Sequence, residues 1–206
     1  MTNNDIGSLG DAELLSMAKD GSTEAMEIII KRYQEPLYNF AIRMTGNRHS
    51  AEDVTQESFL RAIKSLPYYR HKNFRNYIYK IASNLIIDRY RKKEPVVSID
   101  DPFLMHSSNM DDNSITLKDV IPDIETSSPD YIVQKKLMKQ KISDAIAGMP
   151  EEQRRVFSLR VFSGLSFREI SEICGCSLNT ALGRMHYAVE KIRKFLESRE
   201  MTREKI

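Results

Sequence analysis

The sequence predicts an all-α protein with two helical domains joined by an extended acidic linker. Three observations support this prediction. Apolar residues recur at helical spacing from about residue 11 to residue 93, the composition changes between residues 94 and 130, and helical spacing returns from residue 131. The expected divisions are therefore 1–93, 94–130 and 131–206. A chain of 206 residues is long enough for two small domains of this kind.

The composition narrows the class of protein. Hydrophobic residues make up 41% of the chain and charged residues 29%, which is typical of a globular protein with ample material for a core. No apolar run approaches the roughly 20 residues of a membrane span, and the first residues lack the pattern of a signal peptide. The two cysteines, Cys174 and Cys176, are too few for a disulfide framework. We therefore expect a cytoplasmic protein without stable membrane insertion.

Residues 11–45 are expected to form two helices separated at Asp20-Gly21-Ser22. Their predicted core residues recur at helical spacing: Leu14, Leu15, Met17, Ala18, Ile28, Ile29, Tyr33, Leu37, Phe40 and Ala41. A third helix is expected to begin at a capping box formed by Ser50 and Asp53.

The third helix has one apolar face and one mixed face. Its predicted buried residues are Ala51, Thr55, Ser58, Phe59, Ala62 and Leu66. The opposite face carries Asp53, Gln56, Leu60 and Lys64, so a large apolar side chain lies among charges and an amide. This mixture favours a surface that docks on a partner.

The fourth helix has aromatic and basic residues at both ends, in residues 68–73 and 89–93. The face predicted to be buried holds Phe74, Ile78, Ile81, Ala82 and Leu85. The other side holds Asn76, Tyr79, Lys80, Ser83, Asn84, Ile87, Tyr90 and Arg91. Aromatic rings offer stacking surfaces to unpaired bases, and cations follow the phosphates, so the stretch favours binding of single-stranded nucleic acid. The alternative is a solvated basic helix with half-buried tyrosines.

Residues 94–130 contain scattered prolines, serines and acidic residues, and Lys118 is their only lysine or arginine. No periodicity persists, so we interpret the segment as a linker. Helical patterning then returns over Tyr131–Gly148 and, after Pro150, over Glu151–Phe162.

The C-terminal residues predict a helix-turn-helix. Ser166 and Glu169 form a plausible capping box for a short helix over Phe167–Ile173. Gly175 ends this helix, and Ser177 can cap a long helix over Leu178–Leu196. Two helices joined by a tight turn with a glycine are typical of this motif.

The last helix has a polar face suited to DNA. Its predicted buried stripe is Leu178, Ala181, Met185, Ala188, Ile192 and Phe195. The far side carries Asn179, Gly183, Tyr187 and Glu190, flanked by Thr180, Arg184 and His186. Several of these residue types bond to bases or phosphates in the major groove. A glycine inside a helix costs about 1 kcal/mol against alanine, so we expect a packing or close-approach reason for Gly183. The alternative is an ordinary helical hairpin with a polar outer face.

Three segments together resemble the sigma-70 family, specifically its extracytoplasmic-function group. They are AEDVTQESFLRAIKSL, FRNYIYKIASNLIIDRYRKK and LSFREISEICGCSLNTALGRMHYAVEKIRKFL. The resemblance covers nearly the whole chain in the family's order. It implies a factor that binds bacterial core RNA polymerase through its largest and second-largest subunits. Such a factor recognises promoter DNA, double-stranded at the −35 element and single-stranded at the −10 element, and helps to open the −10 DNA. It also implies an anti-sigma partner, and a linker near the RNA exit path.

The resemblance also implies three sets of site residues. Core polymerase would be bound by Asp53, Gln56, Glu57, Leu60 and Lys64. The −10 DNA would be bound by Tyr68, Tyr69, Lys72, Asn73, Asn76, Tyr77, Lys80, Asn84 and Arg91. The −35 DNA would be bound by Arg168, Ser177, Asn179, Thr180, Gly183, Arg184 and Tyr187.

Two departures from the family pattern affect these sites. Tyr77 stands where the family commonly has tryptophan. In the last helix Leu182, Gly183 and Tyr187 replace a common lysine, serine and arginine, so two cations that could bind DNA are missing. We therefore expect phosphate anchoring to rest on Arg184 and nearby cations such as Arg168.

No catalytic or cofactor constellation is expected. Asp88 is expected to form a structural ion pair rather than act as a catalytic acid. Cys174, Cys176 and His186 fit no closed pattern of four zinc ligands, and His71 and His106 are expected to be solvated. The alternatives to a sigma factor are a helical enzyme such as a phosphohydrolase, a dimeric DNA-binding repressor, and a scaffold that never touches DNA. Run-off transcription with core polymerase separates all of these.

Overall fold

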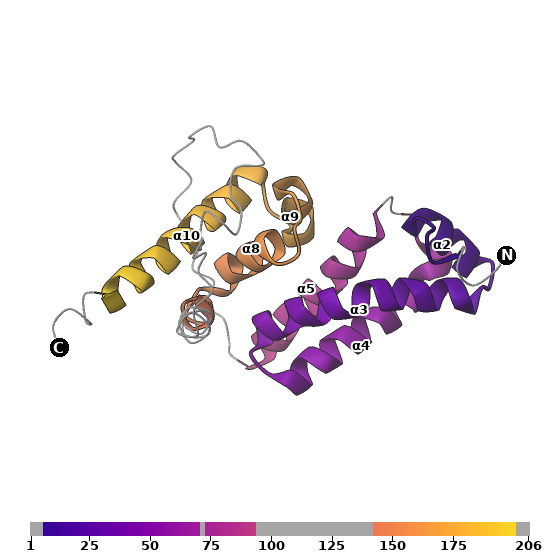
Figure 1. Cartoon of the computed structure of the whole chain (residues 1–206), viewed down its shortest axis with the longest axis horizontal. Coiled ribbons are helices and arrows are strands. Elements are labelled where there is room, and N and C mark those ends of the chain that lie inside the picture. Colours follow the sequence, from indigo (N-terminus) through magenta and orange to yellow (C-terminus); the bar gives the residue numbers. More distant parts are fainter. Residues whose placement is uncertain (1–5, 71–72, 94–141, 201–206) are drawn as a thin grey trace, which may run out of the picture. The chain divides into compact units, whose positions relative to one another are not determined.

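The computed structural model describes residues 6–70, 73–93 and 142–200. Most of these residues are helical and none forms a strand, which confirms the predicted all-α class. The chain divides into two compact units, one holding α2–α5 and the other α8–α10 (Figure 1). The predicted linker over 94–130, most of the helix expected over Tyr131–Gly148, and His71, Lys72 and His106 lie outside the described residues.

In the described part of the first unit, four helices form a bundle. They are α2 (Asp11–Lys19), α3 (Thr23–Thr45), α4 (Arg48–Ser65) and α5 (Phe74–Lys93), with a 3₁₀ turn, η1 (Leu66–Tyr68), after α4. Helix α3 packs against both α4 and α5, and these three run side by side in Figure 1. The break expected at Asp20-Gly21-Ser22 is present, with Ser22 Oγ accepting a hydrogen bond from the Ala25 amide.

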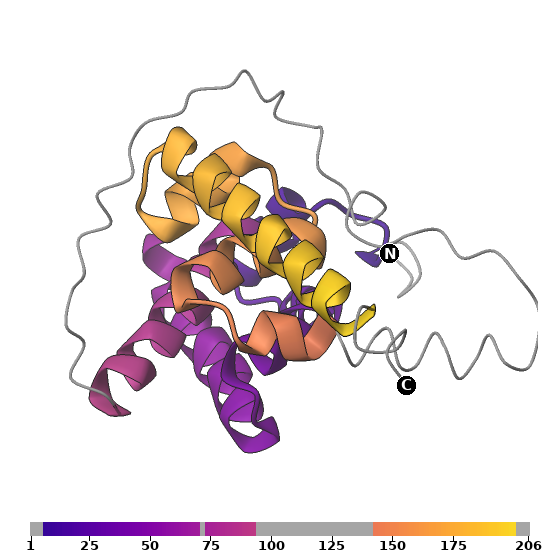
Figure 2. The same ribbon diagram turned by 90° about the vertical axis from the view of Figure 1, so that its left-hand side faces the viewer.

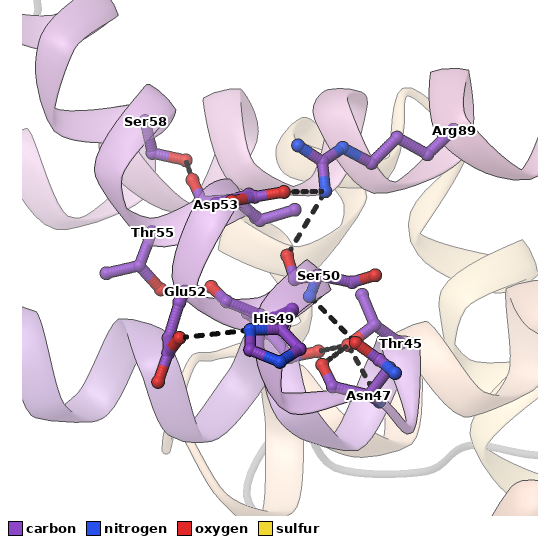
Figure 3. Close-up of polar contacts among 12 residues, drawn as sticks. Thr45, Asn47, His49, Ser50, Glu52, Asp53, Thr55, Ser58 and Arg89 are labelled. Carbon is purple, nitrogen blue, oxygen red and sulfur yellow. Dashed lines mark hydrogen bonds and ion pairs between the residues drawn. The ribbon is translucent and has the colours of Figure 1, made fainter.

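The start of α4 differs from the prediction. The helix begins at Arg48, and its cap is Asn47, whose Oδ1 accepts a hydrogen bond from the Ser50 amide at 3.0 Å (Figure 3). The expected capping box of Ser50 and Asp53 is therefore wrong. Asparagine is as good an N-cap as serine, and it follows Gly46, which ends α3 in the left-handed conformation at φ 64°.

The predicted buried face of α4 is confirmed, with Val54 added to it. Its two small polar residues are satisfied within the helix. Thr55 Oγ1 donates to the Ala51 carbonyl at 2.8 Å and Ser58 Oγ to the Val54 carbonyl at 2.6 Å. Hydrogen bonding of this kind removes most of the cost of burying a hydroxyl.

Helix α5 is buried over a wider arc than the sequence predicted. Tyr79 and Ser83, expected on its outer side, are 1% and 0% exposed, whereas Ile81 on the predicted inner face is only partly buried. The Tyr79 ring meets Phe40 of α3 edge to face, with 5.4 Å between ring centroids. The cause is that α5 packs against α3 as well as α4.

The second unit contains α8 (Glu151–Val161), α9 (Phe167–Cys174) and α10 (Leu178–Glu200), preceded by helical residues 142–147. Helix α10, the yellow helix of Figure 2, packs against α8 and α9. The predicted stripe on α10 is buried at Ala181, Met185, Ala188 and Ile192. Leu178, expected in this stripe, is instead 41% exposed, because it lies at the first position of the helix.

Candidate functional sites

The residues predicted to dock on a partner gather along one groove between α4 and α5. Asp53, Gln56, Glu57 and Leu60 of α4 line this open groove of about 410 Å³. Lys64 is exposed on the same helix but is not among the lining residues. Four other lining residues were not predicted: Arg61, Leu85, Asp88 and Arg89. They become recognisable only once α5 is placed beside α4.

Arg89 fixes one end of this groove. Its Nη1 donates to the Ser50 carbonyl at 3.3 Å and to Asp53 Oδ2 at 3.4 Å, so one guanidinium joins α5 to the first turns of α4 (Figure 3). The Asp53 side chain is 62% exposed, and such a surface pair adds little to stability. The carboxylate therefore keeps most of its surface available to a partner.

The middle of the groove combines an apolar side chain with paired charges. Leu60 is a large apolar residue, yet its exposed fraction is 51%. Beside it, Arg61 Nε donates to Glu57 Oε1 at 2.7 Å, and this hydrogen bond lowers the pKa of the Glu57 carboxyl. Asp88 is exposed and makes no ion pair with any described residue, so the expected structural pair is wrong.

The tyrosines before α5 have different environments. Tyr68, at the end of η1, is 84% exposed. Tyr69 is 7% exposed, with its ring against Phe74 and Tyr77 at centroid distances of 6.0 and 5.0 Å, and burial raises its pKa to about 12. Lys19 of α2 donates to the Tyr69 carbonyl at 2.6 Å. Of these two rings, Tyr68 is the one that offers a free face to a base.

The outer side of α5 presents a polar line along the helix. Asn73, Lys80, Asn84 and Arg91 are exposed, and Asn76 is partly buried. At 1.5 Å per residue the line from 73 to 91 is about 27 Å long. Asn73, Asn76 and the neighbouring Tyr77 also have structural contacts. Asn73 Oδ1 caps α5 by accepting from the Asn76 amide at 3.2 Å, and the Tyr77 hydroxyl lies 2.6 Å from that of Ser65.

The predicted helix-turn-helix is confirmed. Ser166 and Glu169 form the capping box of α9, and Gly175 ends α9 at φ 64° and ψ 36°. Ser177 Oγ accepts from the Thr180 amide at 3.0 Å and lies 2.8 Å from the Thr180 hydroxyl. The side chains of Ser177 and Thr180 are therefore already engaged in starting α10.

The outward line of α10 contains a glycine with open space above it. Asn179 is exposed and Tyr187 is 38% exposed. A Cβ placed on Gly183, between them, would meet no atom within 4 Å. Among the described residues, no contact outside the neighbouring backbone of α10 gives a packing reason for Gly183.

Arg184 points to the flank of α10 that faces α8. Its Nη2 donates to Glu152 Oε2, and its side chain is only 18% exposed. Arg168 on α9 is exposed instead. The two arginines predicted to hold phosphates thus differ, because only Arg168 presents its charge without a carboxylate partner among the described residues.

Within the described ranges, no group of three histidine, cysteine or acidic side chains could hold a metal ion. Burial raises the pKa of the Cys174 thiol to about 11, so this thiol is unreactive at neutral pH. In the same part of the chain, no helix is long and apolar enough to cross a membrane.

The fold comprises one unit with a helix-turn-helix and a second unit, a helical bundle with an open groove between α4 and α5. Comparisons with known proteins agree. Sigma-70 region 2 matches residues 29–95 and Sigma-70, region 4 matches residues 139–192. The ECF RNA polymerase sigma factor SigW of Bacillus subtilis (strain 168) is 31% identical over 88% of this chain and 94% of that protein. The RNA polymerase sigma-H factor of Pseudomonas aeruginosa is 25% identical over 91% and 94%.

Solved structures support the fold. CnrH, determined in complex with the cytosolic domain of CnrY, has a TM-score of 0.64 and 18% identity, covering 91% of this chain and 97% of that one. The sigma factor RpoE of Bartonella quintana, in complex with the anti-sigma factor NepR, has a TM-score of 0.59 and 20% identity, covering 83% of this chain and 96% of that one.

The chain belongs to the extracytoplasmic-function group of the sigma-70 family. It therefore acts in promoter-specific transcription initiation by RNA polymerase.

Proposed function

We propose that the groove between α4 and α5 is the surface through which this chain binds core RNA polymerase. The observation that carries the proposal is the exposed Leu60 among the charges of Asp53, Glu57 and Arg89. An apolar side chain surrounded by polar groups is the arrangement found at the centre of protein interfaces. Lys64, one turn further along α4, extends the same exposed surface.

The −10 DNA is then bound along the polar line of α5. Lys80 and Arg91 supply charge for the backbone of a single strand, and Asn76 and Asn84 supply amides. Tyr68, with its ring exposed at the start of this line, is the residue that stacks on an unpaired base. The ring contact between Tyr69 and Tyr77 holds the end of η1 against α5.

The −35 DNA is bound by the outward line of α10. Asn179 reads a base edge, Tyr187 contacts a base or phosphate, and Gly183 allows the backbone of the helix to come close to the DNA. Ser177 and Thr180 hold the first turn in place, and Arg168 anchors a phosphate from α9.

The test is run-off transcription with purified core polymerase on a library of genomic promoter fragments. The full-length chain should add specific transcripts that core polymerase alone does not make. If the transcripts with and without the chain are the same, the proposed function is wrong. A non-specific fragment of equal length and composition is the control for end-initiated transcription.

Three further points complete the proposal. The chain catalyses no reaction of its own, acts in the cytoplasm and is held inactive by an anti-sigma protein. Support for such a partner comes from CnrH and from RpoE of Bartonella quintana, whose structures were determined with CnrY and with the anti-sigma factor NepR. A partner of this kind should stop the specific transcripts of the run-off reaction when it is added before core polymerase. If it does not compete with core polymerase, it is not an anti-sigma factor for this chain.

A further inference from the structure

One arginine of α10 is already bound to a carboxylate of the same unit. Arg184 Nη2 donates to Glu152 Oε2, and the two side chains are 18% and 54% exposed. About two turns further along α10, Lys191 Nζ donates to the carbonyl of Gly148, a residue that lies just before α8. Both cations on this flank of α10 are therefore drawn towards α8 and its preceding turn.

We propose that Glu152 competes with DNA phosphate for Arg184 and thereby lowers the affinity of this helix-turn-helix for all DNA sequences alike. The inference rests on the proposed role of α10 in binding the −35 DNA. A carboxylate and a phosphate are alternative anions for the same guanidinium fork. A phosphate that takes Arg184 must displace Glu152, and it leaves that carboxylate beside a DNA backbone of like charge.

The position of Glu152 makes it an effective competitor. It lies in the first turn of α8, where the helix dipole stabilises a negative charge. Arg184 is mostly covered by protein, and a covered charge without a partner is costly, so the pair persists when no DNA is bound. Neutralising Glu152 would leave Arg184 without a carboxylate, and a DNA phosphate would then be its best available anion.

Glu152→Gln keeps the shape of the side chain and removes its charge. We expect reconstituted holoenzyme with this variant to bind promoter DNA about tenfold more tightly, the worth of a hydrogen bond to a charged group. The plot of log affinity against log salt should become steeper by about 0.9, because one more phosphate is neutralised. Base preference should stay unchanged, since a phosphate contact carries no sequence information.

Two controls separate this competition from a general effect of charge. Glu151→Gln removes the same charge one residue away, from a side chain that has no ion pair with Arg184. It should change the affinity much less. In an Arg184→Ala background, Glu152→Gln should have no effect, because the group for which the two anions compete is gone. Glu152→Asp, which keeps the charge, should stay near the wild type and shows that any gain does not come from a loosened helix.

The measurement is fluorescence anisotropy of holoenzyme on labelled double-stranded promoter and non-promoter fragments, from 50 to 200 mM salt, the range over which phosphate contacts are resolved. A gain with Glu152→Gln that vanishes in the Arg184→Ala background supports the proposal. An equal gain in both backgrounds, no gain, or a loss of affinity overturns it. If the wild-type chain adds no promoter binding to core polymerase, the proposed function itself fails, and this inference fails with it.

Discussion

Gly183→Ala separates the two demands on α10, which are to fold and to approach DNA. No described residue lies within 4 Å of the added methyl group, apart from the neighbouring backbone of α10, and the backbone conformation is helical, so alanine fits without strain. Replacing a glycine inside a helix by alanine stabilises it by up to about 1 kcal/mol. For a unit as small as the α8–α10 domain, that amount raises the melting temperature by about 4–8 °C.

The same methyl group should weaken binding to the −35 DNA. If the helix backbone touches DNA at Gly183, an added methyl group must push the two surfaces apart. Overpacking of this kind costs roughly 1–3 kcal/mol, or at least about a fivefold loss of affinity. The variant is thus expected to be more stable and to bind less well. Gly183→Ser adds the same carbon and a hydroxyl, so the close-approach reasoning predicts that it also binds less well than the wild type, even though its hydroxyl can donate to a phosphate.

The assay combines two measurements on the full-length chain. Hydrogen exchange of the α10 amides reports the stability of this unit separately from that of the bundle. Anisotropy of holoenzyme on a −35 fragment reports the affinity, with Arg168→Ala as a variant that should weaken binding through a phosphate instead. A gain in stability with unchanged affinity would refute the close-approach reasoning. An unchanged stability would refute the claim that a methyl group fits at Gly183 and stabilises the helix.

The remaining predictions concern the other two surfaces and base reading. Gln56→Ala combined with Leu60→Ala should weaken retention by immobilised core polymerase while the melting temperature changes little, because both side chains are exposed; a large drop in melting temperature would place them in the fold instead. Tyr68→Ala should lower permanganate reactivity of the −10 thymines without loss of stability, whereas Tyr69→Ala should cost about 3–5 kcal/mol of stability. The reverse assignment is correct if only Tyr69→Ala affects opening in a folded protein. Asn179→Ala should relax preference at one or two −35 positions, by about 1–3 kcal/mol, in a selection on randomised sequences; unchanged preference would exclude Asn179 from base reading.

Local features of the sequence predicted the helix-turn-helix well. The capping box of Ser166 and Glu169, the turn at Gly175 and the cap at Ser177 all depend on residues within four positions of one another. Short-range hydrogen bonds of this kind are visible in a sequence because their geometry is set by the helix alone. The prediction of where α4 begins was wrong for a related reason. Asn47 and Ser50 are both good N-cap residues, and only the backbone conformation decides which of them caps the helix.

Packing between helices was less predictable. A period of 3.6 residues locates the centre of a buried face but not its width. Tyr79 and Ser83 were predicted on the outer side of α5, and they are buried because this helix packs against α3 as well as α4. The prediction for Leu178 was wrong in the opposite sense. This residue continues the apolar stripe of α10 beyond the point where neighbouring helices cover it, so it is exposed instead of buried.

The electrostatics of the −35 surface depend on pairing that no local pattern reveals. Counting cations in the sequence suggested that Arg184 compensates for the lysine and arginine missing at Leu182 and Tyr187. Its partner Glu152 lies 32 positions earlier in the chain, and the contact exists only because α8 packs against α10. The charge available to phosphates is therefore smaller than the number of basic residues indicates. Since counterion release scales with phosphates neutralised, Arg168 should contribute more to the salt dependence of DNA binding than Arg184 does, as long as Glu152 holds Arg184.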